Sequence, residues 1–537
     1  MTEAAAGRTL HRQSHGRIDG GVAVAVGVLV LLSLAVSVLT GGAVEAVLGV
    51  FLGGALLALV WVVPLRWSTT LLLFLGLTME SPYEAFACYV FQTPLEPLGR
   101  LLLGNLNLTT HVSWMKVSGF DCLLVYLLVV HAVRRVRGSD IDTRGCTPMA
   151  RPMLVAISIS LASMVALWAW GLANGGDLTK SLLQILKLVE TVILCLVLHS
   201  AYRGVADLRA LGYGLVIAAV YRALWAVWIY RHVSIESGVL PTSTTHADSA
   251  LFASALTLLA IEANERVRRS THWSRVLAAA IILAGMVYNH RRLVWIAISG
   301  SLTIVLLVSP RTPLKRRLAR LALVVLPLVG LYVAAGWDQR DSAVFKPVAT
   351  LRSVVDSKSD GSTQWRDMEN SSLVQNISDH PWFGTGFGHE YIEYWKLPSV
   401  SESYPLYRTI PHNSLLAYFV FAGPAGIAGI FAMLITAIFL AARSYRSAAD
   451  PATRSAALLC IVLIFNFLNL MYGDIGVVYW IPVLTLAPAM MLAGKLAVAT
   501  GAWPHRTTRS RLRSLALAQR RREVVPAPEP EPGWSAR

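Results

Sequence analysis

Charged residues are scarce in this chain. Only 15% of its 537 residues are Asp, Glu, Lys or Arg, against about 25% in an ordinary soluble domain, and 55% are hydrophobic. This shortage of charge excludes a single soluble globule. Cysteine is scarce too: the five cysteines are scattered without C-x-x-C spacing, so neither a disulfide framework nor a zinc site is predicted, and no other metal or cofactor is expected. The chain also lacks an internal repeat and the paired broken helices that mark many transporters.

Apolar runs long enough to cross a bilayer recur from one end of the chain to the other. A membrane-spanning helix needs about 20 apolar residues. The predicted spans are 21–40, 44–64, 67–79, 117–133, 153–173, 182–201, 210–230, 247–264, 276–289, 293–309, 321–336, 424–442, 455–471 and 475–497. The first is longer than the apolar region of a signal peptide and is interpreted as a retained span. We therefore expect an all-α polytopic membrane protein with about 14 transmembrane helices.

The basic residues gather on alternate connections between these spans. One set of connections carries 23 Lys and Arg residues, whereas the opposite short connections carry six. By the positive-inside rule both termini are cytoplasmic, in the inner (plasma) membrane of a cell. The formal net charge of +16 therefore reflects topology, and no nucleic acid partner is expected. The segment from Arg506 to Arg522 adds seven arginines, and the tail is predicted to form a basic interfacial helix followed by a Pro-rich disordered end.

One connection, Trp337 to Pro411, is far longer than the others. It has 75 residues, with ten acidic and seven basic side chains, and by the alternation it lies outside the cytoplasm. Its many aromatics argue against a disordered linker and predict a mostly helical cap, and long ordered loops usually carry function. The predicted organisation is a bundle of about 11 helices (1–336), the cap (337–411), a re-entrant half-helix with three spans (412–497) and a basic tail (498–537).

Charges inside predicted spans are costly and are candidates for function. Lys187 and Glu190, three residues apart on one helix, suit either a structural pair or a functional one. Arg222 has no partner in its own span, which favours function. Arg291 and Arg292 lie on the side where basic residues are rare; snorkelling would explain one of them, but two suit a diphosphate, because guanidinium groups bind phosphate oxygens bidentately.

The segment after the long connection begins with a polar group at the start of an apolar helix. His412 and Asn413 precede nine mostly apolar or small residues, and Gly423-Pro424 then breaks the helix. The first piece is predicted to be a half-helix whose N-terminus faces the outer cavity, and this position favours a catalytic role for His412. The preceding Gly384-Thr-Gly-Phe-Gly388 predicts a tight glycine turn rather than a nucleotide site.

These motifs resemble the signature of the O-antigen ligase and polymerase family. The resemblance rests on His412-Asn-Ser-x-Leu416 with Gly423-Pro-x-Gly426, and on His380-Pro-x-x-Gly384-x-Gly386 shortly before. Arg366 falls where the family has a loop arginine, and Arg292-Leu-Val-Trp295 resembles its Arg-x-x-apolar start of a span. Thr245 to Asp248 occupies the place of a short polar motif. Glu369 departs from the family, because many members have an aromatic residue three positions after the loop arginine.

The resemblance implies a GT-C-type glycosyltransferase. Such an enzyme takes a glycan from a polyprenyl (undecaprenyl) diphosphate carrier outside the cytoplasm, without a nucleotide sugar or an obligatory metal, and passes it to a glycan, lipid or protein acceptor. His suits a general base near neutral pH. The roles we assign are His412 as base or acceptor-positioning residue, and Arg366 with Arg292 or Arg291 on the diphosphate. Substrate contacts are assigned to Arg222, Asn413, His246, His380, Trp382 and Tyr394.

Three other functions remain open from the sequence. A lipid-linked oligosaccharide flippase or another transporter fits the spans and internal charges, but leaves the cap and its histidine motif unexplained. A transferase with an acidic pair in its first outer loop is disfavoured, because that connection is only Gly41-Gly42-Ala43. A scaffold or receptor would leave Arg222, Arg291 and His412 without a role. Ligase and polymerase share the same motifs, so the acceptor stays open.

The topology gives the first prediction. In a chain freed of its native cysteines, a Ser357→Cys site in the long connection should react with a membrane-impermeant thiol reagent in intact cells. A Ser510→Cys site in the basic tail should react only after lysis. The reverse pattern would show that the long connection is cytoplasmic.

Overall fold

The computed structural model describes residues 60–79, 94–106, 117–139, 145–234, 243–265, 272–310, 312–339, 361–396, 406–474 and 479–504, with a few residues between these ranges. The predicted first span, most of the second, the Ser357 labelling site and the tail beyond residue 504 lie outside the described residues.

The described chain is helical throughout, and its only strand-like pairing is an isolated bridge between Asn105 and Ser118. The helices are α3 (Leu65–Thr78), α4 (Glu96–Leu103), α6 (Gly119–Val136), α7 (Arg151–Ala173), α8 (Leu178–Ala201), α9 (Leu208–Ile229), α11 (His246–Asn264), α12 (His272–Asn289), α13 (Arg292–Val308), α14 (Pro313–Gly336), α16 (Gly361–Asp379), α17 (Ser414–Ile430), α18 (Ala432–Ser447), α19 (Pro451–Gly473) and α20 (Trp480–Ala499). Short 3-10 or π turns are η1 (Val205–Asp207), η2 (Tyr230–Ser234) and η3 (Ala343–Phe345).

The helices agree with the predicted spans wherever both can be compared. The third to fourteenth predicted spans each coincide with a helix, and α17 and α18 share the twelfth. Among the described residues, seven helical segments are long and apolar enough to cross a membrane. The all-α, multi-pass class is therefore confirmed, whereas the count of 14 crossings and the GT-C-like arrangement remain predictions.

Local sequence signals place the helix starts. Ser118 accepts a hydrogen bond from the backbone N–H of Asp121, whose carboxylate accepts one back from the N–H of Ser118, which is a capping box. Thr245 and Asp248 form the same arrangement at the start of α11. Asp177 and Asp450 cap α8 and α19 through their carboxylates. Each cap satisfies N–H groups that have no partner within the helix.

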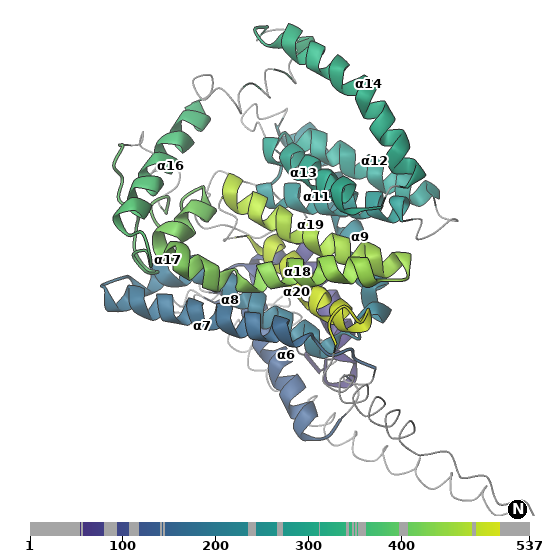
Figure 1. The fold of residues 1–537 in the computed structure, drawn as a ribbon. Helices are drawn as coiled ribbons and strands as arrows, with labels where there is room; N and C mark the ends of the chain where they lie inside the picture. Colours follow the sequence, from purple (N-terminus) through teal and green to yellow (C-terminus); the bar gives the residue numbers. More distant parts are fainter. Residues whose placement is uncertain are drawn as a thin grey trace, which may run out of the picture.

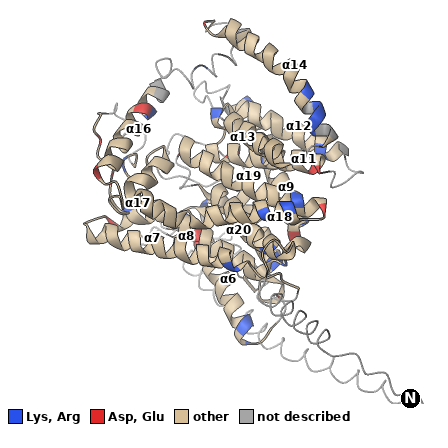
Figure 2. Cartoon of the chain, viewed as in Figure 1, with Lys and Arg blue, Asp and Glu red and all other residues tan. Residues whose placement is uncertain are grey.

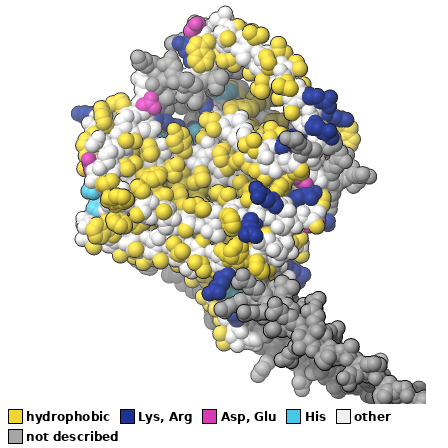
Figure 3. Space-filling model, viewed as in Figure 1, with side chains coloured by type: hydrophobic (Ala, Val, Ile, Leu, Met, Phe, Trp, Pro, Cys, Tyr) yellow, Lys and Arg dark blue, Asp and Glu magenta, His cyan; other side chains and the backbone are white. Residues whose placement is uncertain are grey.

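Helix α20 lies at the centre of the bundle and packs against α8, α18 and α19 (Figure 1). Nearly all of its side chains are buried, including Lys495, whose ammonium group donates to the carbonyls of Thr147 and Tyr202. Helix α14 stands apart from this bundle in Figure 1, and its hydrophobic side chains are largely exposed. Figure 3 shows a broad band of hydrophobic side chains over the visible face of the bundle, as expected of a surface that meets lipid.

The two ends of the bundle differ in charge. Figure 2 shows patches of Lys and Arg at one end of each of α9, α14 and α18. These ends lie away from α16, on which Asp and Glu are visible. The C-terminal turns of α18 carry Arg443 and Arg446, and Arg209 lies at the start of α9. The position of the cap outside the cytoplasm remains a prediction.

Helix α17 is broken at Gly423, as the sequence predicts. Gly423 has φ 61° and ψ 172°, which are not helical angles. Pro424 has no N–H, so the carbonyl of Val420 loses its usual partner four residues on. The backbone N–H of Thr385 in the cap donates to this carbonyl at 2.9 Å, and the N–H of Gly386 donates to the carbonyl of Phe421 at 2.8 Å. The carbonyl groups freed at the break therefore accept hydrogen bonds directly from the backbone of the cap.

The glycine turn of the cap fits closely against the membrane helices. Gly384, Gly386 and Gly388 all have positive φ, between 65° and 103°. A Cβ on Gly386 would lie 2.3 Å from the Cα of Gly171 in α7, and the N–H of Gly388 donates to the side chain of Gln184 in α8 at 2.7 Å. The turn predicted after Pro381 is thus confirmed, and its glycines permit backbone contact that any side chain would prevent.

We predict that Gly423→Ala destabilises the protein. A Cβ at this position would lie 2.3 Å from the carbonyl oxygen of Trp382 and would occupy a left-handed conformation, which together should cost about 1–3 kcal/mol. Thermal unfolding of the purified full chain in detergent measures the effect. Gly330→Ala on α14 is the matched control, because a Cβ there meets no atom within 4 Å. Equal unfolding temperatures for the two variants would show that the break tolerates a side chain.

Candidate active site

His412 lies directly before α17 and is held by helix α16 of the cap. The backbone N–H of His412 lies 3.2 Å from each carboxylate oxygen of Glu369, and its ring Nδ1 lies 3.6 Å from Glu369 Oε1. The ring of Trp365 meets the imidazole edge to face, with 4.5 Å between centroids. Glu369 is 0% exposed, so its carboxylate is a fixed partner for both the backbone and the side chain of His412.

Asn413 ties the start of α17 to the cap a second time. Its side-chain oxygen caps the helix by accepting the N–H of Leu416 at 3.1 Å, and its amide nitrogen donates to Asn370 of α16 at 3.1 Å. The predicted substrate contact of Asn413 therefore coexists with a structural one. Because Glu369 and Asn370 are adjacent on α16, one turn of that helix orients both residues of the His412-Asn413 pair.

Arg291 faces the start of α11 rather than open solvent. Its Nη1 donates to His246 Nε2 at 3.0 Å, and its Nε donates to the carbonyl of Thr244 at 3.1 Å. A guanidinium group can only donate, so Nε2 of His246 must be the acceptor, and the imidazole is neutral with its proton on Nδ1. That Nδ1 is buried without a hydrogen-bond partner among the residues that the structure describes, which makes it a candidate donor to a ligand.

Asn289 fixes the geometry of this pair. Its side-chain oxygen accepts from the N–H of Thr244 at 3.2 Å and from the Thr244 hydroxyl at 2.9 Å, and its amide donates to Ser249 at 3.1 Å. His290 then turns the chain with a φ of 54°, and Arg292 begins α13. The polar motifs at 245–248 and 289–292, which are separate in the sequence, are therefore one unit in the fold.

Asp474 joins the two halves of the site. Its Oδ2 accepts from the hydroxyl of Tyr479 at 2.8 Å and lies 3.9 Å from His246 Nε2. The Asp474 carbonyl accepts from Ser414 at 3.2 Å, and the adjacent carbonyl of Gly473 accepts from Arg366 Nη1 at 2.9 Å. The end of α19 thus contacts both the cap arginine and the start of α17.

The charges around Asp474 favour its anionic form. Burial raises the pKa of this carboxyl, but the electrostatic interactions with His246 and then His412 oppose burial, and the pKa is lowered. Arg366 and the hydroxyl of Tyr479 act in the same direction. At neutral pH Asp474 is therefore a carboxylate near Arg366 and two histidines, in a cluster able to bind an anion and to hold a base.

Arg222 lies elsewhere, in a buried ion pair. Its Nη1 is 2.9 Å from Asp248 Oδ1, and its other donors reach the carbonyls of Leu77 and Met79. Asp248 also caps α11, so Arg222 supports the helix start that carries His246. Lys187 and Glu190 likewise form an ion pair at 2.8 Å, which is the structural alternative left open by the sequence.

Three of the predicted substrate contacts, His380, Trp382 and Tyr394, lie on the surface of the cap. His380 and Trp382 follow α16 and are exposed, Trp382 by 71%. Tyr394 is 45% exposed, and its hydroxyl donates to Asp379. Among the residues that the structure describes, no group of three or more His, Cys, Asp or Glu side chains is arranged to hold a metal ion.

Sequence reasoning did not find two residues of this cluster. Glu369 appears in the sequence only as a departure from a motif, and Asp474 follows an apolar run without a motif of its own. One signal was available for Asp474: a carboxylate at the end of a span, in Tyr-Gly-Asp, on the side where Arg291 and His412 lie.

The fold and this cluster define a multi-pass helical membrane protein with a polar site under a docked cap. A family model described as O-antigen ligase matches residues 277–431, and the resemblance seen in the sequence is confirmed. The matched segment includes Arg291, Arg366, Glu369 and His412, whereas His246 and Asp474 lie outside it. A comparison with curated proteins gives no match.

Proposed function

We propose that this protein is a glycosyltransferase that moves a glycan from a polyprenyl diphosphate carrier to an acceptor hydroxyl outside the cytoplasm. The observation that carries the proposal is the grouping of Asp474, Arg291, Arg366 and His412 around His246, inside and beside the region that matches the O-antigen ligase family. This family domain and the apolar helices suit a lipid-linked glycan as donor and a bilayer as its source.

His412 is the proposed general base. Its Nδ1 faces Glu369, which leaves Nε2 as the ring nitrogen for the acceptor. Nε2 takes the proton of the acceptor hydroxyl while the oxygen forms a bond to the anomeric carbon of the donor, and the bond from that carbon to the diphosphate oxygen breaks with its electron pair. Glu369 holds the ring in place and stabilises the imidazolium that results.

Arg291 and Arg366 are the proposed diphosphate ligands. The leaving diphosphate gains negative charge as the bond breaks, and preorganised guanidinium groups stabilise that charge most in the transition state. Two hydrogen bonds of Arg291 go to neutral acceptors, Thr244 and His246, which orient it without cancelling its charge. Arg366 is oriented in the same way by the carbonyl of Gly473. Because these arginines supply positive charge, the proposal requires no metal.

The acceptor is a glycan, a lipid or a protein, since a ligase and a polymerase need the same chemistry. The direct test incubates the purified full chain with a lipid-linked glycan and measures released polyprenyl diphosphate, with each acceptor class supplied in turn. Release that depends on one acceptor supports the proposal and identifies the acceptor. Passage of the intact glycolipid across a vesicle without release would instead establish the flippase alternative.

The two adjacent arginines give a matched pair of variants. We predict that Arg291→Lys lowers kcat/KM about ten- to hundredfold, because lysine keeps the charge but loses the planar fork that reaches both His246 and Thr244. Arg292→Lys should be affected less, because Arg292 is the first residue of α13 and the contacts to α11 come from Arg291. The reverse order, measured as polyprenyl diphosphate release, would assign the donor phosphate to Arg292.

His412→Ala should remove turnover and leave donor binding nearly intact. General bases contribute about 10² to 10⁴ in rate, so kcat should fall by that factor while the dissociation constant for the donor changes little. His232→Ala is the control, because His232 is an exposed residue of η2 that stacks on Trp228 of α9. Turnover of His412→Ala within a few-fold of wild type would remove this residue from the mechanism, and a parallel loss of donor affinity would show that it binds the diphosphate.

A further inference from the structure

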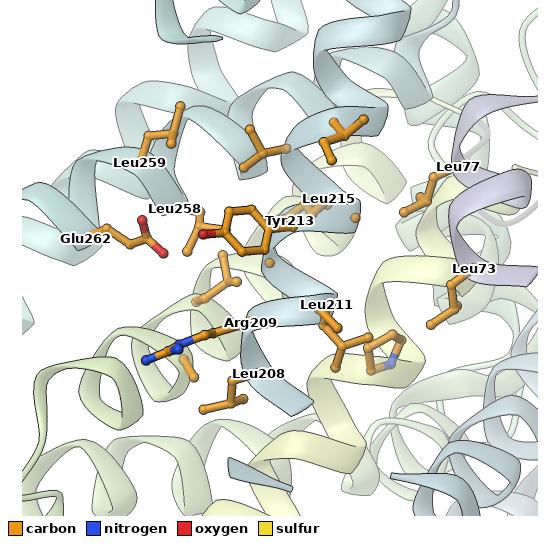
Figure 4. A pocket seen from close by; sticks show the side chains of 18 of the residues that line it. Leu73, Leu77, Leu208, Arg209, Leu211, Tyr213, Leu215, Leu258, Leu259 and Glu262 are labelled. Carbon is orange, nitrogen blue, oxygen red and sulfur yellow. The ribbon is translucent and has the colours of Figure 1, made fainter. Parts of the chain in front are cut away.

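A second cavity lies at the opposite end of the bundle from His412. It has a volume of about 370 Å³ and is lined by α3, α9, α11, α12, α19 and α20 (Figure 4). Helix α11 begins with His246 at the candidate active site and reaches Glu262 at this cavity. Those 16 residues rise about 24 Å as helix, so the cavity is separate from the site under the cap.

The cavity has an apolar side and a polar side. Leucine is the commonest residue of its wall, and Leu73, Leu77 and Leu215 are examples. In Figure 4 the polar ends of Arg209 and Glu262 lie on the side away from Leu73 and Leu77. A ligand that fills it would therefore be apolar along its length and polar at one end.

The polar side carries net positive charge. Glu262 forms an ion pair with Arg275 at 3.1 Å, which cancels both charges. Arg209 is exposed, and within the described part of the chain no carboxylate lies at ion-pair distance from it. A guanidinium at the mouth of an apolar cavity is complementary to a lipid phosphate.

The glycines of α9 open the cavity wall. Gly212 and Gly214 both line it, and a Cβ on Gly214 would meet no atom within 4 Å. A Cβ at position 214 is therefore accommodated without a clash, so a larger side chain can be introduced there to fill the cavity.

We propose that this cavity binds an acyl chain of an anionic phospholipid, with the phosphate at Arg209. The chain would replace water along the leucine wall, and the phosphate would lie at the basic end of the bundle, which the charge distribution predicts to be cytoplasmic (Figure 2). A polyprenyl diphosphate fits less well, because with its charged end at the candidate active site it would place only its apolar tail in the cavity and would offer Arg209 no anion. Apart from Ala278, the lining residues lie outside the segment that matches the O-antigen ligase family.

Native mass spectrometry of the purified full chain in detergent tests the proposal. The probes are phosphatidylglycerol, phosphatidylcholine and undecaprenyl phosphate, each added separately at matched concentration. We expect a one-to-one complex with phosphatidylglycerol that survives at collision energies that remove phosphatidylcholine. Equal retention of the two phospholipids, or preferential retention of undecaprenyl phosphate, would overturn the proposal.

Two variants with matched controls place the lipid in the cavity. Gly214→Leu fills the space and should abolish the complex, whereas Gly330→Leu on exposed α14 should retain it. Arg209→Gln should weaken phosphatidylglycerol binding about fivefold, the contribution typical of one basic residue at an anionic membrane surface, whereas Arg320→Gln on α14 should not. Unchanged binding in both cavity variants would overturn the proposal. The readout does not involve glycan transfer, so it is independent of the proposed enzyme activity.

Discussion

The missing N–H of Pro424 is the constraint on which the rest of the site depends. Because Pro424 cannot donate, the carbonyl of Val420 is left without a helical partner inside the bundle, where an unpaired carbonyl costs about 1–3 kcal/mol. The N–H of Thr385 satisfies it at 2.9 Å, and the N–H of Ala425, freed from Phe421, donates to Trp382. A helix break that would be a defect in isolation thus becomes the docking point of the cap, and the cap positions α16 over the start of α17.

The active site is consequently assembled from two parts of the chain that meet only when the cap docks. Helix α16 contributes Glu369 and Arg366, while the membrane helices contribute Arg291, His246 and Asp474 around them. The end of α19 connects the two parts. The carboxylate of Asp474 lies near His246, and the carbonyl of the neighbouring Gly473 accepts a hydrogen bond from Arg366. Loss of cap docking should therefore disturb the base His412 and the phosphate ligand Arg366 together, since Glu369, which holds His412, and Arg366 both come from α16.

The sequence predicts those features that are local and misses those that depend on distant partners. The helix break and the glycine turn both follow from residue types and spacing within a few positions. Glu369 could not be assigned, because its partner His412 lies 43 residues away and no periodicity links them. The interpretation of Arg222 as a residue without a partner was limited in the same way, because Asp248 is on another helix. Predicted spans succeed because bilayer thickness imposes one length on every crossing.

The contrast between Arg222 and Arg291 shows what makes an arginine suitable for an anionic substrate. Both are held by acceptors on neighbouring elements, but Arg222 is paired with the Asp248 carboxylate, which cancels its charge and repays the cost of burying it. Arg291 donates to a carbonyl and to a neutral imidazole, which fix its direction and leave its charge available. The neutral state of His246 therefore preserves the positive charge of the site. An anionic residue at position 246 would orient Arg291 equally well, but it would remove the positive potential that a departing diphosphate needs.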